Sequence, residues 1–176
     1  MSDLQQTTEI FDVVDENDEV IGQAPRPDVH ARKLHHRAIH IFVWNSKGEL
    51  FLQFRSRLKK NHPQTWDSSC SGHLSTGQDY YEAAIRELEE EIGLDETQTK
   101  AIRPVFKVKS CPETEQEHVW LYEMVHDGPF QLQAEEIEDG RFFSQNDIQK
   151  MISENPVQFA PSFVYIWNLY LRQQKS

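Results

Sequence analysis

The sequence predicts a mixed α/β sandwich built as a single domain. Segments of strand-like composition come first, one long amphipathic helix lies mid-chain, and further strands and two helices follow. The length of 176 residues suits one domain with a sizeable core. Hydrophobic residues make up 38% and charged residues 27%, which is typical of a globular protein.

The first elements are short strands separated by turn-forming residues. Residues 1–8 are polar, and we expect them to be loose. Residues 10–14 favour a strand, the acidic run after them favours a turn, and residues 20–22 favour a return strand. This pattern predicts an N-terminal hairpin over about residues 9–24. Residues 25–36, which contain two prolines, are expected to form an irregular connection.

A second hairpin is predicted just after this connection. Residues 38–44 are apolar and β-rich, residues 45–48 supply a turn, and residues 50–54 form the partner strand. Residues 55–77 then make a long connection rich in polar side chains. Long structured connections in compact domains are often functional.

The central helix is predicted over residues 79–92. Ala84, Ile85, Leu88 and Ile92 form one apolar stripe, and Gly93 supplies a stop signal. The elements expected after it are strands at 103–109, 118–125 and 140–143, and helices at 145–154 and about 161–173, which Pro156 separates. The apolar stripe of the last helix indicates packing, and a homodimer interface there stays open.

Charge and composition exclude several functional classes. The net charge of −11 disfavours broad binding to nucleic acid polymers, which depends on Lys and Arg. No apolar run approaches the roughly 20 residues that a membrane helix needs. The start of the chain lacks the pattern of a secretory signal, and Cys70 and Cys111 make no disulfide framework. We therefore expect a cytoplasmic protein without membrane attachment.

One face of the predicted central helix carries three glutamates. Glu87, Glu90 and Glu91 share one face of about 100° beside the apolar stripe, and Arg86 stands four residues before Glu90. Clustered carboxylates cost stability unless a cation neutralises them, and hard oxygen ligands suit Mg²⁺ or Mn²⁺. The alternative for such a run alone is a solvated acidic face with ordinary ion pairs.

The residues around this face resemble the Nudix box over residues 72–94. The matching positions are Gly72, Arg86, Glu87, Leu88, Glu90, Glu91, Gly93 and Leu94. One position departs, because Gln78 stands where the family has Glu. The resemblance implies a Nudix-type α/β/α sandwich that hydrolyses a diphosphate linkage in a nucleoside diphosphate derivative or a similar small phosphorylated substrate. It also implies that Glu87, Glu90 and Glu91 bind Mg²⁺ or Mn²⁺, and that Arg86 orients Glu87.

Residues 36–40, 48–56 and 70–73 carry a second resemblance, which covers roughly residues 10–145. They resemble type 1 isopentenyl diphosphate isomerases, which have the same fold. This resemblance implies a second metal site, to which this chain would contribute His36, His73, Glu115 and Glu117, with His30 a looser match. Such isomerases need a cysteine where this chain has Ser71. A hydroxyl has a far higher pKa than a thiol, so isomerase activity is the weaker alternative.

Several side chains have more than one interpretation. Arg55 and Lys59 resemble residues that hold the diphosphate in isomerase-like relatives, or they form a solvated basic turn. His73 is a ligand, a substrate-binding residue or a cap. His40, in an apolar strand, is expected to be a core histidine with its hydrogen bonds satisfied. Glu115 and Glu117 would point the same way in an extended segment. A non-catalytic binding module is the remaining alternative, supported by Gln78.

Overall fold

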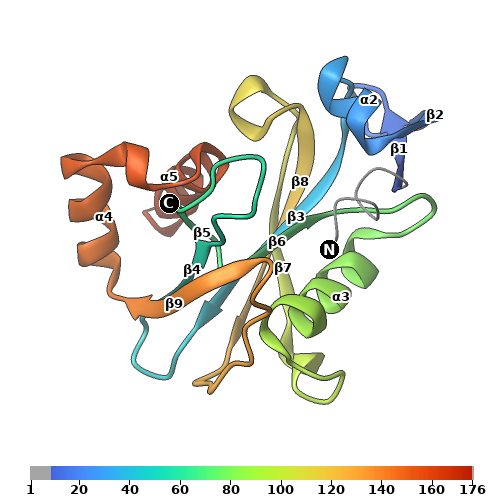
Figure 1. The fold of residues 1–176 in the computed structure, drawn as a ribbon. Helices are drawn as coiled ribbons and strands as arrows, with labels where there is room; N and C mark the ends of the chain where they lie inside the picture. The colour runs from blue at the N-terminus through green and yellow to red at the C-terminus, as the bar shows by residue number, and fades with distance from the viewer. Residues whose placement is uncertain (1–8, 176) are drawn as a thin grey trace.

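A computed structural model describes residues 9–175 (Figure 1). The expectation that residues 1–8 are loose lies outside the described residues. A two-stranded sheet and a seven-stranded mixed sheet are flanked by helices, as the predicted α/β sandwich requires. Within the described part of the chain, no helix is both long and apolar enough to cross a membrane.

The N-terminal hairpin is formed as predicted, with β1 (Ile10–Val14) antiparallel to β2 (Val20–Pro25). The prediction of an irregular connection over 25–36 is wrong in part, because α2 (Arg26–Ala31) follows at once. Proline is compatible with the first turn of a helix, where its missing N–H costs nothing. Val29 of α2 is buried against Phe11 and Ala24, so the hairpin and α2 share a small core.

The main sheet divides into two groups of strands, called wings here, one built on residues 36–44 and the other on residues 50–55. β3 (His36–Trp44) pairs in parallel with β8 (Glu117–Val125) and antiparallel with β6 (Cys70–His73). β4 (Leu50–Arg55) instead pairs with β9 (Ile137–Phe143) and β5 (Trp66–Asp67). Both strands of the predicted second hairpin exist, but they meet only at Trp44 and Leu50. They then diverge because β6 takes the place beside β3, and Figure 1 shows the two wings splayed.

Helix α3 (Tyr80–Ile92) confirms the central helix and both of its ends. Asp79 caps the start of the helix, because its carboxylate accepts a hydrogen bond from the backbone N–H of Glu82. The carboxylate of Glu82 in turn accepts one from the backbone N–H of Asp79. Gly93 ends it at φ 74°, a left-handed conformation that favours glycine. The helix buries Leu88 and Ile92 against Ile39 and neighbouring residues of β3.

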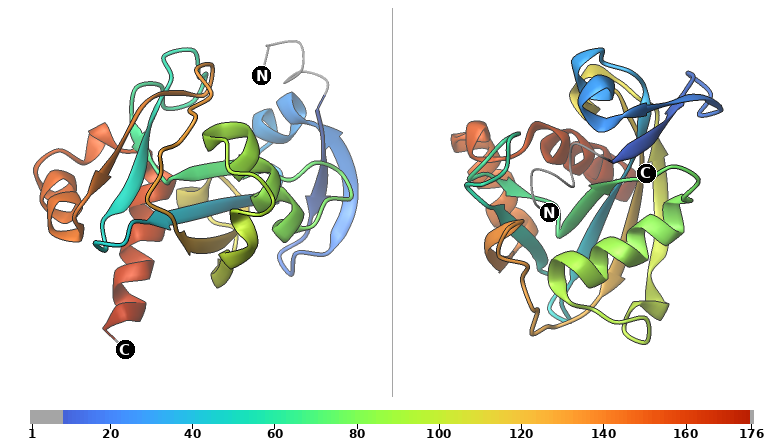
Figure 2. Two further views of the ribbon diagram at one scale, coloured as in Figure 1. Left: turned by 90° about the horizontal axis from the view of Figure 1, so that it is seen from below. Right: turned by 45° about the vertical axis from the view of Figure 1, so that its right-hand side comes forward.

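The remaining elements follow the predicted order. β7 (Arg103–Val108) pairs with β8, β9 begins three residues before the predicted strand, and short helical turns occur at Thr99–Ala101, Pro112–Thr114 and Pro156–Gln158. α4 (Gln145–Glu154) and α5 (Pro161–Gln174) cover the sheet face opposite α3. The stripe of α5 is packed into the core, including Trp167, which is fully buried. Figure 2 shows that these two helices and the N-terminal hairpin lie at opposite ends of the molecule.

Candidate active site

A cavity of about 640 Å³ lies where the two wings separate. Its walls come from α2, β3, the segment 55–73, α3, the turn before β8, the segment before β9 and the start of α5. All the ionisable residues assigned to the site from the sequence line this cavity, except His36, which lies beside it in contact with His73. Residues far apart in the chain therefore converge on one place.

The acidic face of α3 lies along the cavity. Glu87 and Glu91 are buried, while the side chain of Glu90 is 53% exposed. Burial raises the pKa of Glu87 to about 7 and raises that of Glu91 well above its usual range. Gln53 of β4 donates a 2.8 Å hydrogen bond to Glu91, so the opposite wing supports this carboxylate. The three carboxylates therefore offer oxygen ligands of the kind that divalent cations prefer.

Arg86 joins this cluster to the strand before it. One guanidinium nitrogen donates to Glu87 at 2.6 Å and to Glu90 at 3.1 Å, and the other donates to the carbonyl of His73 at 2.9 Å. The second nitrogen also reaches the amide oxygen of Gln78 at 3.3 Å. Arg86 has the contacts needed to orient Glu87.

Gly72 leaves room for the buried carboxylate beside it. A Cβ atom at this position would lie 2.1 Å from Oε1 of Glu87, which is far inside a van der Waals contact. A side chain at position 72 would therefore push the Glu87 carboxylate away from strand β6 and from its 2.6 Å contact with Arg86.

A second cluster contains three histidines and one glutamate. Ring nitrogens of His30, His36 and His73 all lie within 4.8 Å of one another. His73 Nε2 is 2.8 Å from Oε1 of Glu117, and His36 Nε2 is 3.5 Å from the same oxygen. Burial lowers the pKa of His73 to about 3, so the ring is neutral at pH 7. The rings of His36 and His73 also stack on Phe11, and the ring of His30 meets Phe11 edge-on, so Phe11 closes the cluster on the side of the hairpin.

Two buried nitrogens in this cluster lack a hydrogen bond, although His36 Nε2 has Oε1 of Glu117 at 3.5 Å. Nε2 of His30 and Nε2 of His36 make no hydrogen bond among the described residues. Such orphaned atoms are costly in a folded protein unless a ligand satisfies them. His30 belongs to the cluster because α2 carries its ring there. In the sequence it was only a looser match to the isomerase metal site.

Glu115 departs from the expected arrangement. The prediction that Glu115 and Glu117 point the same way is wrong, because Glu115 and Gln116 adopt φ values of 54° and 68°. This left-handed turn breaks the extended backbone, and Glu115 binds His62 at 2.8 Å instead of the histidine cluster. Glu117, the first residue of β8, alone reaches the cluster.

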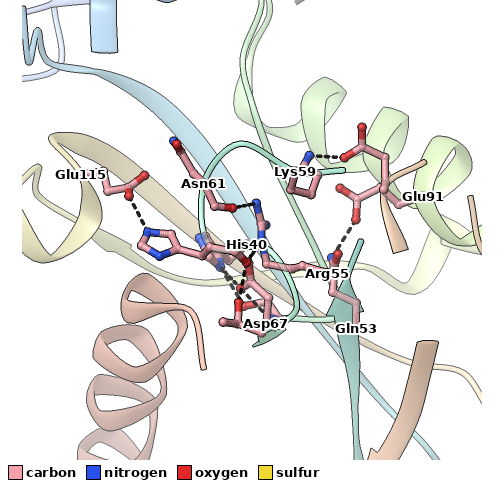
Figure 3. A network of polar contacts seen from close by, with 12 residues as sticks. His40, Gln53, Arg55, Lys59, Asn61, Asp67, Glu91 and Glu115 are labelled. Atoms are coloured by element: carbon pink, nitrogen blue, oxygen red, sulfur yellow. Dashed lines mark hydrogen bonds and ion pairs between the residues drawn. The ribbon is translucent and has the colours of Figure 1, made fainter. Parts of the chain in front are cut away.

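The basic residues of the segment 55–65 are largely engaged in contacts within the protein (Figure 3). Arg55 donates to the carboxylate of Asp67 at 3.0 Å and to the carbonyls of Asn61 and His62. Lys59 forms an ion pair with Glu136, and both side chains are largely buried. Gln53 and Asp67 were missed as site residues, because only the pairing of β4 with β5 brings them together.

Comparison with known proteins agrees with this geometry. A family model described as the NUDIX domain matches residues 34–163. The chain belongs to the Nudix hydrolase family. As a Nudix hydrolase, it is 32% identical over 165 residues to an uncharacterised Nudix hydrolase of Yersinia pestis, covering 93% of this chain and 86% of that one.

A further relative points to the isomerase-like branch of the family. The chain is 31% identical over 163 residues to an isopentenyl-diphosphate Delta-isomerase 2 of Photorhabdus laumondii, with 91% of both chains covered. Among solved structures, DR0079 from Deinococcus radiodurans matches with a TM-score of 0.76 and 28% identity, covering 84% of this chain and 90% of that one. The NUDIX domain of Shewanella oneidensis NrtR, solved with ADP ribose, shares the fold at a TM-score of 0.60 and 12% identity, covering 79% and 87%.

Proposed function

We propose that this Nudix hydrolase cleaves the diphosphate linkage of a small phosphorylated substrate, with Mg²⁺ or Mn²⁺ held by Glu87, Glu90 and Glu91. The observation that carries the proposal is the buried carboxylate cluster at the edge of the cavity. Two of its members, Glu87 and Glu91, are buried, and burial raises the pKa of both carboxyl groups. The charge of Glu87 raises the pKa of Glu91 further, and a bound cation would offset both costs.

The donor set fits a hard divalent cation. The cluster offers carboxylate oxygens, which are the ligands that Mg²⁺ prefers. Four of the five basic residues on the cavity wall, Arg26, Arg55, Lys59 and Arg86, are already paired with carboxylates, so the wall alone offers little net positive charge to a diphosphate. An anionic substrate in an acidic cavity therefore requires metal ions between the two.

Individual side chains have separate roles in the proposed hydrolysis. When bound, the cation neutralises phosphate charge and acidifies the attacking water. Arg86 orients Glu87 through its 2.6 Å contact, and Glu90, the exposed carboxylate, accepts the proton of the water. Arg55 and Lys59 lie on the opposite wall, where Arg55 pairs with Asp67 and Lys59 with Glu136. Their remaining N–H groups donate to diphosphate oxygens.

The first test is metal dependence. A cation that binds only the native state at 100 times its Kd adds about 2.7 kcal/mol of stability. Mg²⁺ or Mn²⁺ should therefore raise the melting temperature of chelator-treated protein. A phosphate-release screen over nucleoside diphosphates, dinucleotides, nucleotide sugars and prenyl diphosphates should give turnover that stops in excess chelator. Full activity in chelator would overturn the proposal, and ligand binding without any turnover would favour a non-catalytic binding module.

A second metal centre is proposed at His30, His36, His73 and Glu117. The two orphaned imidazole nitrogens and the neutral His73 support it, since neutral imidazole with carboxylate suits transition metals and Mg²⁺. Glu115 could join only if it leaves His62. Metal analysis of purified protein should show less bound metal in His73→Ala and Glu117→Ala than in the parent. Unchanged metal content in both variants would exclude this centre and leave the α3 cluster untouched.

Isomerase activity has less support than hydrolysis. Ser71 lines the cavity at the position where the isomerase needs its thiol, whereas Cys70 is fully buried in the core beneath α3. Successive residues of a strand point to opposite faces, so Cys70 cannot turn toward the cavity without breaking β6. Burial also raises the pKa of the Cys70 thiol.

A further inference from the structure

The cavity has a second polar region, on its α5 side, which the hydrolytic machinery does not use. Here the lining residues are Ala38 and His40 of β3, Asp67 of β5, and Ala160 and Ser162 at the start of α5. Figure 3 places His40 beside Asp67 and Arg55, away from Glu91 and Gln53. Whatever part of a substrate extends beyond the diphosphate on this side meets these groups.

One ring nitrogen of His40 contacts the protein, and the other can hydrogen-bond to a ligand. The residue is 3% exposed, and Nδ1 lies 2.7 Å from the hydroxyl of Ser68. Asp67 Oδ1 is 4.0 Å from the same nitrogen, and Nε2 has no polar partner among the described residues. Burial lowers the pKa of His40, so the ring is neutral. A buried histidine with one free ring nitrogen beside a cavity is a preorganised hydrogen-bonding group.

The neighbours of His40 are small or hydrogen-bonding. Ser162 offers a hydroxyl, and the carboxylate of Asp67 is neutralised by Arg55 at 3.0 Å. Ala38 and Ala160 leave space between these polar groups. Neutral donors and acceptors around a small space match hydroxyl groups, since each buried polar atom needs a partner.

The same walls offer little to a nucleobase or a prenyl chain. Among the described residues that line the cavity, the only rings are imidazole and proline, and none carries a large aliphatic side chain. Aromatic residues close by are used in packing: Trp66 contacts Phe54 and Phe143, each with ring centroids 5.0 Å apart. A base gains affinity by stacking and a prenyl chain by burial against apolar surface.

We propose that this region is a subsite for a hydroxylated group, a sugar or polyol, next to the diphosphate of the substrate, with His40 and Ser162 as its hydrogen-bonding residues. The inference rests on the proposed hydrolysis. It assigns the substrate class as a sugar or polyol diphosphate ester recognised through its hydroxyls and not through a base. In the reaction, the oxygen of water bonds to the terminal phosphorus, the bridging P–O bond breaks, and the ester leaves as a monophosphate with the bond's electron pair.

The first arm of the test varies the base. The values of kcat/KM for ADP, GDP, CDP and UDP should agree within about 3-fold, because no group reads the base. The base-free 5-phosphoribosyl 1-diphosphate should be cleaved within about 10-fold of ADP, and isopentenyl diphosphate should be poorer than both. A spread of more than about 30-fold among the four nucleotides, or a preference for the prenyl compound, would overturn the subsite.

The second arm couples substrate hydroxyls to the two side chains. Replacing ADP by 2′,3′-dideoxyadenosine diphosphate should lower kcat/KM about 10-fold or more in the parent, because buried polar groups lose their partners. In His40→Leu and Ser162→Ala the two substrates should become nearly equal, and His40→Gln, which keeps a donor, should restore part of the discrimination. Ser153→Ala, an exposed serine of α4, is the matched control.

The outcomes separate the two proposals. Equal discrimination in the parent and in both subsite variants would exclude the subsite while leaving hydrolysis intact. Loss of turnover on every compound in the parent would instead overturn the proposed function. Bound metal should be the same in His40→Leu and the parent, because His40 is not in the histidine cluster.

Discussion

Oε1 of Glu87 lies 2.6 Å from a guanidinium nitrogen of Arg86 and fills the space that a side chain at position 72 would need. Arg86 also binds the carbonyl of His73, a member of the histidine cluster. One side chain thus connects the two candidate metal centres. Displacement of Arg86 is expected to disturb both.

Replacing Glu87 by Gln should lower kcat by roughly two to three orders of magnitude, equivalent to about 3–4 kcal/mol of transition-state stabilisation. The fold should survive, because Gln has the shape of the protonated carboxyl group and removes a buried charge. Steady-state kinetics with a thermal melt measures both effects. Glu89→Gln, on the exposed side of α3, is the control and should keep parental activity.

Replacing Arg86 by Lys should lower kcat/KM about 10- to 100-fold, because lysine cannot make the forked contacts to Glu87, Glu90 and the carbonyl of His73. Arg141→Lys, in an exposed ion pair, should have no such effect. Retention of full activity in Arg86→Lys would show that charge alone suffices.

Replacing Gln78 by Glu should tighten Mg²⁺ binding about 2- to 10-fold. Gln78 already accepts a 3.3 Å bond from Arg86, and a carboxylate there would make that bond charge-assisted. Titration of activity against Mg²⁺ concentration measures the change. Weaker Mg²⁺ binding in this variant would indicate that a further negative charge is harmful at this site.

Replacing Asp18 by Asn should destabilise the fold by about 1–3 kcal/mol near neutral pH, because Asp18 accepts from Arg37 at 2.6 Å, from Tyr80 at 2.8 Å and from Lys107. Burial raises the pKa of Asp18, but these three contacts lower it more, so the pKa is lowered overall. Chemical denaturation measures the difference, and Asp139→Asn, in an exposed pair, is the control.

The contribution of Asp18 should depend on pH in one direction. A carboxylate with a lowered folded-state pKa stabilises fully above its unfolded pKa of about 3.9, and that stabilisation is lost as pH falls through the folded value. The stability difference between the parent and Asp18→Asn should therefore persist from pH 7 to about 5 and shrink below pH 4. A difference that grew on acidification would contradict the assigned contacts.

Cys111 should react with a thiol reagent in the native protein, whereas Cys70 should react only after unfolding. Cys70 is fully buried with a raised thiol pKa, and Cys111 is partly exposed. Thiol titration should count one reactive group in buffer and two in denaturant. Rapid labelling of Cys70 in the native state would show that β6 opens readily.

The acidic face of α3 was predictable from sequence because helical periodicity and end signals are local. Glu87, Glu90 and Glu91 stand within one turn or so of each other, and Asp79 and Gly93 mark the ends by their own chemistry. The candidate metal locus follows from that segment, and the family resemblance rests on it together with Gly72. The prediction that His40 is a satisfied core histidine is confirmed only in part. The residue is buried and Nδ1 contacts Ser68, but the ring lines the cavity.

The rest depended on contacts between distant segments. β3 and β4 separate because β6 pairs with β3, and this separation opens the cavity. His30 reaches the histidine cluster only because the hairpin and α2 pack as a unit, and Glu115 leaves it because the backbone turns left-handed there. The free energy of packing between distant segments decides which strands pair, which path each loop takes and that Arg55 binds Asp67. The spacing of residues along the chain does not contain this information.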